Sequence, residues 1–432
     1  MPPQTQQERR QANYVLAILF LVLMFNFIDR QIVGIVADSI KADLNLSDTQ
    51  VGLMTGLSFA IFYTTLSIPL AIVADRWNRS KVIAIAIAIW SVMTILCGAA
   101  TSFIQIFLAR IGVGIGEAGS SPASHSLIAD LFPPERRSTA LGIFAMSVSV
   151  GSFLAFTGGS WLAENFGWRW TLIAAGAPGI IISLIIWTTI KDPRGDKPLR
   201  EAFKSRPGET KLSDAIAELS SKWAYWHLII AGAIVSFVAY GVQTFYFPVF
   251  SRIHEVPVSE YSELGIKLGL MFLVFGSAGA YLGGKCGDYF NSREPGGSLL
   301  ASAIIFVISI PFMYFALYAE SLAMGVLILG IPQLAFSFFF GPCFSSIQML
   351  ASDKTRAFSV SIWIMFSGLV GLGLGPLTVG ALSDWFVGQG ASAAVGLQQS
   401  VMIVSLFTAL AAVFFWLAQR SLKKELSAQI VD

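Results

Sequence analysis

The chain is dominated by apolar runs long enough to cross a lipid bilayer. A helix needs about 20 mostly apolar residues to cross the hydrocarbon core. Twelve such runs follow one another through the 432 residues, at approximately 13–37, 48–74, 81–101, 103–130, 138–163, 168–190, 224–251, 260–286, 297–318, 321–350, 356–385 and 394–418. Backbone polar groups must pair within the segment in hydrocarbon, so each run is predicted to be a helix. We therefore expect an all-α membrane protein with twelve transmembrane helices.

Composition and charge exclude several classes of protein. Only 12% of the residues are charged, whereas a soluble domain has about 25%. The net charge of +2 and the lack of a basic stripe argue against nucleic-acid binding. The three cysteines (Cys97, Cys286, Cys343) and three histidines (His125, His227, His254) form no metal-ligand spacing, so we expect no metal, no cofactor and no structural disulfide.

Lysine and arginine predict the orientation in the membrane, because they concentrate in cytoplasmic loops. Most of them flank one side of the twelve runs, and the opposite side holds four: Lys41, Arg169, Arg252 and Lys267. This bias places both chain ends in the cytoplasm.

One long polar stretch divides the chain into two halves with six runs each. We expect an N-terminal half at 1–190, a cytoplasmic linker at 191–223 and a C-terminal half at 224–432. Within the linker, 211–221 has the pattern of a short amphipathic helix at the membrane surface.

The two halves carry similar residues at similar separations. Asp75 ends the second run, and Asp288 ends the eighth. The separation in sequence between Gly151 in the fifth run and Gly371 in the eleventh is nearly the same as that between Asp75 and Asp288. Duplication of six spans is typical of one large transporter architecture.

The loop after the second run resembles a known motif. The sequence Asp75-Arg76-Trp77-Asn78-Arg79 is similar to the D-R-x-G-R loop of the major facilitator superfamily, with Asn78 in place of glycine. The resemblance covers the whole chain and implies two pseudo-symmetric six-helix halves with alternating access. Asp75, Arg76 and Arg79 are expected to form a cytoplasmic gating latch.

A narrower resemblance is to the spinster-like branch of that superfamily. It depends on Phe27-Ile28-Asp29-Arg30, on the loop motif, and on Arg110-x-x-x-Gly114-x-Gly116-Glu117. Spinster-like proteins are associated with amphipathic lipids such as sphingosine-1-phosphate and lysophospholipids. The neighbouring branch of organic-anion and sugar-acid symporters also has charges in spans one and four.

Charged residues inside two apolar runs are the strongest indication of a functional site. Asp29 and Arg30 are the only charged residues between Asn13 and Val36, and Arg110 and Glu117 are the only ones between Phe103 and Leu127. A charge at the bilayer centre costs at least ~2.5–3.5 kcal/mol, so such residues face protein and usually mark an ion or substrate path.

Helix geometry predicts how these four residues lie. At 1.5 Å per residue, Asp29 and Arg110 lie at similar depth, and Glu117 lies about 10 Å below Arg110 on the same face. Asp29 and Arg30 diverge by about 100° and should have different partners. Our hypothesis is that Asp29 and Glu117 carry protons, and that protonation frees Arg30 or Arg110 for an anionic headgroup that also contacts Glu117. The alternative is a static ion-pair cluster that holds two helices together.

The second half has no deep charge, so its candidate substrate contacts are polar and aromatic. Tyr240, Gln243 and Phe247 are expected on one face of span seven; the other candidates are Gln333, Ser337, Trp363 and Ser367. Ordinary helix packing is the alternative for each of them.

One motif is misleading. Gly114-x-Gly116-x-x-Gly119 fits the dinucleotide fingerprint, which needs a preceding strand, but here it lies inside a predicted spanning helix. Gly112 and Gly116 are instead expected to admit a neighbouring helix closely, and Pro122 is expected to kink the span.

These observations predict a monomeric secondary transporter that moves an anionic amphipathic lipid with protons. Its expected partners are this substrate, protons and membrane lipids. The alternative substrate is a small organic anion or sugar acid. A membrane enzyme is disfavoured because the sequence has no credible set of nucleophile, base and orienting group. A lipid receptor that does not transport is a third possibility.

Overall fold

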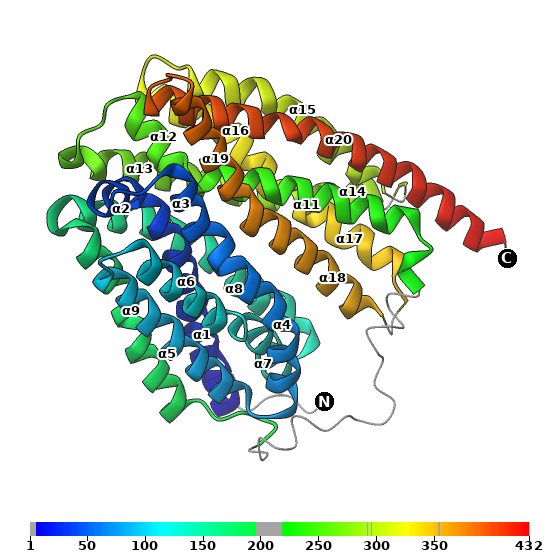
Figure 1. Cartoon of the computed structure of the whole chain (residues 1–432). Coiled ribbons are helices and arrows are strands. Elements are labelled where there is room, and N and C mark those ends of the chain that lie inside the picture. The colour runs from blue at the N-terminus through cyan, green and yellow to red at the C-terminus, as the bar shows by residue number, and fades with distance from the viewer. Residues whose placement is uncertain (1–5, 196–217, 292, 295, 353–354, 432) are drawn as a thin grey trace. The chain divides into compact units, whose positions relative to one another are not determined.

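The computed structural model describes residues 6–195, 218–291, 293–294, 296–352 and 355–431, and it is helical throughout the spans (Figure 1). The first half of the chain forms α1 (Gln6–Ile35), α2 (Ala37–Leu44), α3 (Asp48–Gly52), α4 (Ser58–Arg76), α5 (Arg79–Ala99), α6 (Phe103–Glu117), α7 (Ser120–Leu131), α8 (Pro134–Leu154) and α9 (Ser160–Thr189). The second half forms α11 (Trp223–Thr244), α12 (Tyr246–Ile253), α13 (Tyr261–Met271), α14 (Ser277–Asn291), α15 (Gly297–Leu317), α16 (Leu322–Phe338), α17 (Phe340–Leu350), α18 (Arg356–Gly368), α19 (Gly375–Gly388) and α20 (Ala393–Val431).

Ten of the described helical segments are long and apolar enough to cross a membrane. One of them, Thr139–Thr189, turns at Gly167 (φ 76°, ψ 169°) and therefore holds two of the expected spans. The expected span 103–130 is interrupted at Ala118 and Gly119, between α6 and α7, so neither part reaches the length of a span by itself. These two breaks reconcile the ten segments with twelve spans.

Four π-helical segments recur at matching places in the two halves. They are Leu53–Leu57, Ala155–Gly159, Phe272–Gly276 and Leu369–Leu374, in spans two, five, eight and eleven. A π turn inserts an extra residue and rotates the side chains that follow it, and such turns are frequent at functional sites. Their recurrence supports the internal repeat.

The described residues group into two compact units. Within the described part of the chain, the first unit contains 6–46, 58–195 and 258–269, and the second contains 47–57, 218–257 and the described residues of 270–431. The start of span two thus belongs to the second unit, and the start of span eight belongs to the first. Most of the expected linker, 196–217, lies outside the described residues, and with it most of the expected amphipathic helix.

Small residues bring helices of the first unit close together. A Cβ atom on Gly98 of α5 would lie 2.6 Å from the Arg169 carbonyl oxygen, and one on Gly176 of α9 would lie 2.6 Å from the Ser91 carbonyl oxygen. Close backbone approach through small residues is how membrane helices pack without a hydrophobic driving force.

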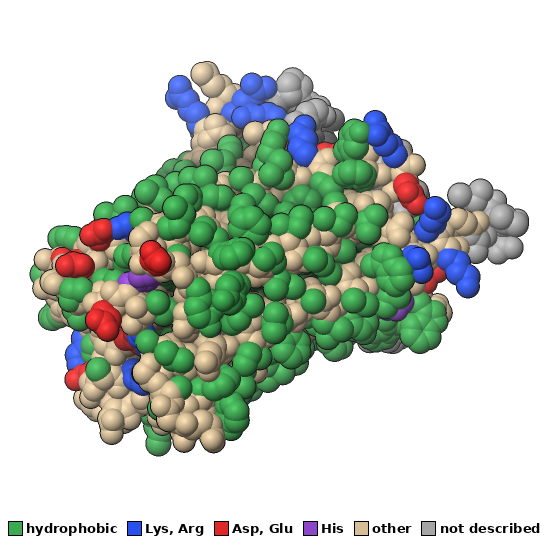
Figure 2. All heavy atoms as spheres, turned by 90° about the horizontal axis from the view of Figure 1, so that it is seen from above, with side chains coloured by type: hydrophobic (Ala, Val, Ile, Leu, Met, Phe, Trp, Pro, Cys, Tyr) green, Lys and Arg blue, Asp and Glu red, His purple; other side chains and the backbone are tan. Residues whose placement is uncertain are grey.

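Hydrophobic side chains cover much of the exposed surface, with charged side chains gathered at the margins of the face shown in Figure 2. Large apolar side chains such as Leu184, Ile181 and Ile104 are more than 60% exposed. Such a surface suits hydrocarbon better than water, and the protein is an integral, multi-pass membrane protein.

Candidate functional site

Four charged side chains meet inside the first unit, from α1 and α6. Arg30 Nε donates to Glu117 Oε2 at 2.8 Å, and Arg110 Nη1 donates to Asp29 Oδ2 at 3.3 Å. Glu117 is fully buried, Asp29 and Arg110 are 2% exposed, and the Arg30 side chain is 14% exposed. With both carboxylates ionised, the two pairs have a formal charge of zero.

The contacts match the geometry expected from helix rise. Asp29 and Arg110 were placed at similar depth, and their ion pair confirms this. The adjacent residues Asp29 and Arg30 have different partners, because consecutive side chains on a helix diverge by about 100°. The structure gives each carboxylate its own arginine.

Several polar atoms in and beside the cluster have no hydrogen-bond partner among the described residues. They are Glu117 Oε1, Arg110 Nε and Asn26 Nδ2. Buried polar atoms are nearly always paired in proteins. Free hydrogen-bonding capacity on both an acid and a base therefore distinguishes this cluster from a fully satisfied structural ion pair.

Two glycines of α6 position the cluster. A Cβ atom on Gly116 would lie 2.7 Å from the Trp90 backbone nitrogen of α5, and one on Gly114 would lie 2.5 Å from the Phe59 carbonyl oxygen of α4. These contacts confirm the expected close approach at Gly116. Gly114 shares the face of α6 that carries Arg110 and Glu117 and brings α4 against it, whereas Gly116 brings α5 alongside α6.

Thr94 of α5 was missed by sequence reasoning. Its single hydroxyl proton is within hydrogen-bond reach of two acceptors, Asp29 Oδ1 and the Trp90 carbonyl oxygen. Nothing distinguished Thr94 in the uninterrupted apolar run 81–101, since a threonine in a membrane helix commonly bonds to its own backbone.

The second unit joins two of its candidate residues. Gln243 Nε2 of α11 donates to Gln333 Oε1 of α16 at 3.1 Å. A Cβ atom on Gly276 would lie 3.8 Å from Gln333 Nε2 and 3.7 Å from Ser337 Oγ. Gln243, Gln333 and Ser337 therefore gather near the π-helical segment of span eight.

Span seven is not the continuous helix that we expected over 224–251. Helix α11 ends at Thr244, Phe245 leaves helical geometry (φ −103°, ψ 8°), and α12 begins at Tyr246. Pro248 has no N–H to bond to Thr244, which favours a break ahead of it. Tyr240 and Phe247, expected on one face of a single helix, therefore lie on separate helices, and Phe247 is buried at 2% exposure.

Trp363 and Ser367 of α18 have different surroundings. The Trp363 indole N–H donates to the Leu228 carbonyl oxygen at 3.0 Å, and its ring lies where a Cβ atom on Gly232 would stand. This is the environment of a packing residue. The Ser367 hydroxyl is buried and has no partner among the described residues.

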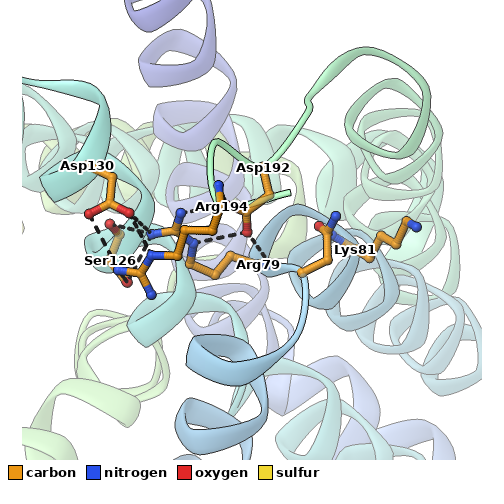
Figure 3. A network of polar contacts seen from close by, with 7 residues as sticks. Arg79, Lys81, Ser126, Asp130, Asp192 and Arg194 are labelled. Atoms are coloured by element: carbon orange, nitrogen blue, oxygen red, sulfur yellow. Dashed lines mark hydrogen bonds and ion pairs between the residues drawn. The ribbon is translucent and has the colours of Figure 1, made fainter. Parts of the chain in front are cut away.

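A second polar network surrounds Arg79 in the first unit (Figure 3). Arg79 is buried and donates to Asp192 through Nε at 3.0 Å, and to Asp130 Oδ2 and Ser126 O through Nη1 at 2.8 and 2.9 Å. Arg194 donates to Asp130 Oδ2 through Nε at 2.7 Å. Burial raises the pKa of Asp192, but hydrogen bonds from Arg79 and Arg194 outweigh it and hold that pKa below its ordinary value.

The rest of the expected latch is less defined. The side chain of Asp75 lies outside the described residues, and Arg76 is the last residue of α4. Asn78, in the position of the motif's glycine, caps α5 by accepting a hydrogen bond from the Lys81 N–H at 2.9 Å. Sequence reasoning missed Asp130 and Asp192, which end spans four and six on the same predicted side and were available as partners for Arg79.

Comparisons with known proteins agree with this architecture. The model of the Major Facilitator Superfamily matches residues 19–376. An efflux pump of this superfamily from Mycolicibacterium smegmatis is 28% identical over 96% of this chain and 95% of its own length. A probable galactarate/D-glucarate transporter from Bacillus subtilis is 28% identical over 64% of each chain.

The solved structures include a bacterial homolog of the human lysosomal transporter Spinster, in an inward-facing and unoccupied conformation. It superposes with a TM-score of 0.82 and is 33% identical, covering 96% of this chain and 98% of that one. The chain is therefore a membrane transporter that belongs to the Major Facilitator Superfamily, within its spinster-like branch.

Proposed function

We propose that this transporter moves an anionic amphipathic lipid by alternating access, coupled to protons at the buried cluster of Asp29, Arg30, Arg110 and Glu117. The observation that carries the proposal is the pairing of Arg30 with a buried glutamate whose second oxygen has no partner among the described residues. Spinster-like proteins are associated with amphipathic lipids, and we base the choice of lipid on the similarity to that branch.

Charge balance links the proton to the substrate. Protonation of Glu117 removes a negative charge and leaves Arg30 with an excess positive charge in a membrane interior, where a lone charge is costly. An anionic headgroup at Arg30 restores neutrality. Proton and headgroup each favour the binding of the other, and such coupling is reciprocal. Asp29 and Arg110 provide a second pair with the same chemistry.

A lipid also needs a surface for its acyl chain. In the second unit Phe247 remains a buried aromatic candidate, and no charged residue lies deep in the accompanying spans in the part of the unit that the structure describes. We propose that this apolar and aromatic half serves the chain of the substrate, with Tyr240 and Ser367 among its contacts.

A small sugar acid is the second candidate substrate. The galactarate/D-glucarate transporter among the relatives favours it, and so does the Gln243–Gln333 pair, because amide groups recognise hydroxyls well. A dicarboxylate would use the same two arginines, while its hydroxyls would engage the glutamine pair.

Reconstituted liposomes distinguish these substrates. We expect labelled sphingosine-1-phosphate or lysophospholipid to move when a pH gradient is imposed, and Glu117→Gln to move it without dependence on the gradient. If labelled glucarate moves and neither lipid does, the sugar-acid function is correct. If Glu117→Gln keeps the full pH dependence, Glu117 does not carry the proton.

Orientation and gating complete the proposal. The loops rich in lysine and arginine, both chain ends and the linker face the cytoplasm, and one chain forms the transport unit. Residues 1–190 and 224–432 act as the two moving halves. In the latch, Arg79 is committed to Asp130 and Asp192 of its own unit, so we expect Asp75 and Arg76 to be the members that exchange partners during gating.

A further inference from the structure

Aromatic rings surround the two arginines of the charged cluster. The Arg30 guanidinium carbon lies 4.5 Å from the centroid of the Tyr63 ring, 5.0 Å from that of Phe59 and 5.4 Å from that of Phe27. The Arg110 guanidinium carbon lies 5.3 Å from the same Phe59 ring. Phe59 therefore contacts one arginine from each ion pair.

The fold holds this ring firmly. Phe59 is 1% exposed and stacks on Tyr63, with the ring centroids 5.1 Å apart. The two residues are one helical turn apart on α4, directly after the π-helical segment Leu53–Leu57. Gly114 packs against the Phe59 backbone, so α6 and the ring are positioned by the same contact.

Both arginines carry a positive charge and would repel each other in a medium without water. The face of an aromatic ring is negative, and a guanidinium above it is attracted most strongly where water is excluded. The Phe59 ring thus stabilises both guanidiniums and adds no ionisable group that could take a proton.

We propose that Phe59 and Tyr63 are positioning residues that hold the Arg30 guanidinium in place when Glu117 gives up its pairing. The rings substitute for the lost carboxylate until a headgroup binds. This inference rests on the proposed function. In it, the two rings set the pH at which the Arg30–Glu117 ion pair opens.

The direction of the effect follows from this role. Without the ring, an unpaired Arg30 is less stable, so the pair stays closed until the pH is lower. The other ionisable groups facing the cluster remain in place: Asp29 on α1, Arg110 on α6, Tyr63 on α4 and Cys97 on α5. Arg136 and Arg137 stand in the first turn of α8.

The test uses Phe59→Leu, which keeps an apolar side chain and removes the ring. We expect the pH of half-maximal lipid transport to fall by about 0.5–1.5 units, corresponding to a 3- to 30-fold change in the opening equilibrium. Phe59→Tyr should restore the wild-type midpoint. Tyr63→Leu should shift the midpoint in the same direction, whereas Tyr63→Phe, which keeps the ring, should not.

A second measurement needs no substrate. The infrared band of the protonated Glu117 carboxyl group, identified by its loss in Glu117→Gln, gives the midpoint for purified protein. A midpoint of Glu117 protonation that moves to lower pH in Phe59→Leu supports the proposal whether or not a lipid is the substrate. An unchanged midpoint in both leucine variants overturns it, even if lipid transport coupled to protons is confirmed.

The matched control is Phe62→Leu, which removes a ring from the same turn of α4. Phe62 has no arginine over its ring among the described contacts. The Phe62→Leu variant should lower the melting temperature of the protein at most modestly. It should leave the midpoints of lipid transport and of Glu117 protonation unchanged. If Phe62→Leu shifts the midpoint as much as Phe59→Leu does, the effect comes from helix packing and the proposal fails.

Discussion

The carboxylate of Asp384 caps Thr49, accepting hydrogen bonds from its backbone N–H at 2.8 Å and from its hydroxyl. This contact lies in the second unit. In the first unit Glu164 caps Ser262 in the same way, through the backbone N–H at 2.9 Å and the hydroxyl. Thr49 and Ser262 are each the second residue of their helix, α3 and α13. The fold therefore uses one capping arrangement twice.

We predict that Asp384→Ala destabilises the protein by about 1–3 kcal/mol, because it leaves donors at the start of α3 without an acceptor while the N-cap residue Ser47 stays in place. The carboxylate also bonds to the Asp48 N–H, so several donors lose their partner together. Thermal unfolding in detergent measures the effect. Asp384→Asn keeps one acceptor oxygen and should fall between wild type and alanine.

Asp288→Ala is the control for that prediction, because Asp288 is an exposed carboxylate near the end of α14. It should change stability by no more than about 0.5 kcal/mol. Equal melting temperatures for Asp384→Ala and wild type would show that the cap contributes nothing to the folded state.

The buried ion pair of Arg79 predicts a larger effect than an exposed one. Arg79 is fully buried between Asp192 and Asp130, and removing one partner of a buried pair costs about 3–5 kcal/mol. Arg79→Ala should therefore unfold at a much lower temperature or fail to accumulate. Arg79→Lys should recover little, because lysine cannot contact both carboxylates with a rigid fork.

Arg194 provides the comparison within the same network. It also bonds to Asp130, but its side chain is 37% exposed, and exposed pairs contribute about 0–1 kcal/mol. Arg194→Ala should melt close to wild type. If it is as unstable as Arg79→Ala, burial does not explain the importance of Arg79.

Thr94→Val tests the hydroxyl that supports Asp29. Valine has nearly the same shape, so it removes the hydrogen bond without opening a cavity. A hydrogen bond to a charged group contributes about 1.5–3 kcal/mol, and we expect stability to fall by that amount. Thr94→Ser keeps the hydroxyl and should restore most of the loss in a thermal melt; equal losses in the two variants would refute a role for the hydrogen bond.

The fold was largely predictable because its signals are long and repeated. Twelve apolar runs and the matching separations of similar residues indicated the duplicated architecture. The caps repeat these separations: Thr49 and Ser262 are as far apart in the sequence as the aspartates that end spans two and eight. The two capping carboxylates are likewise as far apart as the paired glycines of spans five and eleven. The break at Ala118–Gly119 lies just ahead of Pro122, where the sequence predicts a kink. The break at Phe245 was not predicted, although Pro248 follows it closely, because the run around it is as apolar as a continuous span.

The site was predictable only where a residue conflicted with its surroundings. Asp29, Arg30, Arg110 and Glu117 were conspicuous because charge is rare in apolar runs. Phe59 was not, since phenylalanine is ordinary in a membrane helix and its role depends on two arginines from other helices. Contacts between distant segments leave no pattern in the local sequence.

Glu218 lies outside the charged cluster, and its environment predicts how the stability of the protein depends on pH separately from transport. It accepts hydrogen bonds from the Ser352 N–H at 2.9 Å and from the Thr355 hydroxyl at 2.8 Å. Burial raises its pKa, but these bonds and Lys222 outweigh that and lower the pKa to about 2. A lowered pKa means that Glu218 contributes stability above its ordinary pKa of 4.5, and that this stability is lost as the pH falls toward about 2.

Between about pH 5 and pH 8 Glu218 stays ionised, so its contribution to the stability of the protein does not change with pH. Glu218→Gln should therefore lower the melting temperature by a similar amount at both ends of this range and leave the pH profile of transport unchanged. Glu117→Gln, in contrast, should change the pH profile of transport. A transport midpoint that moves in Glu218→Gln would mean that the attachment of the linker end to the start of α18, and not the cluster alone, sets the pH response.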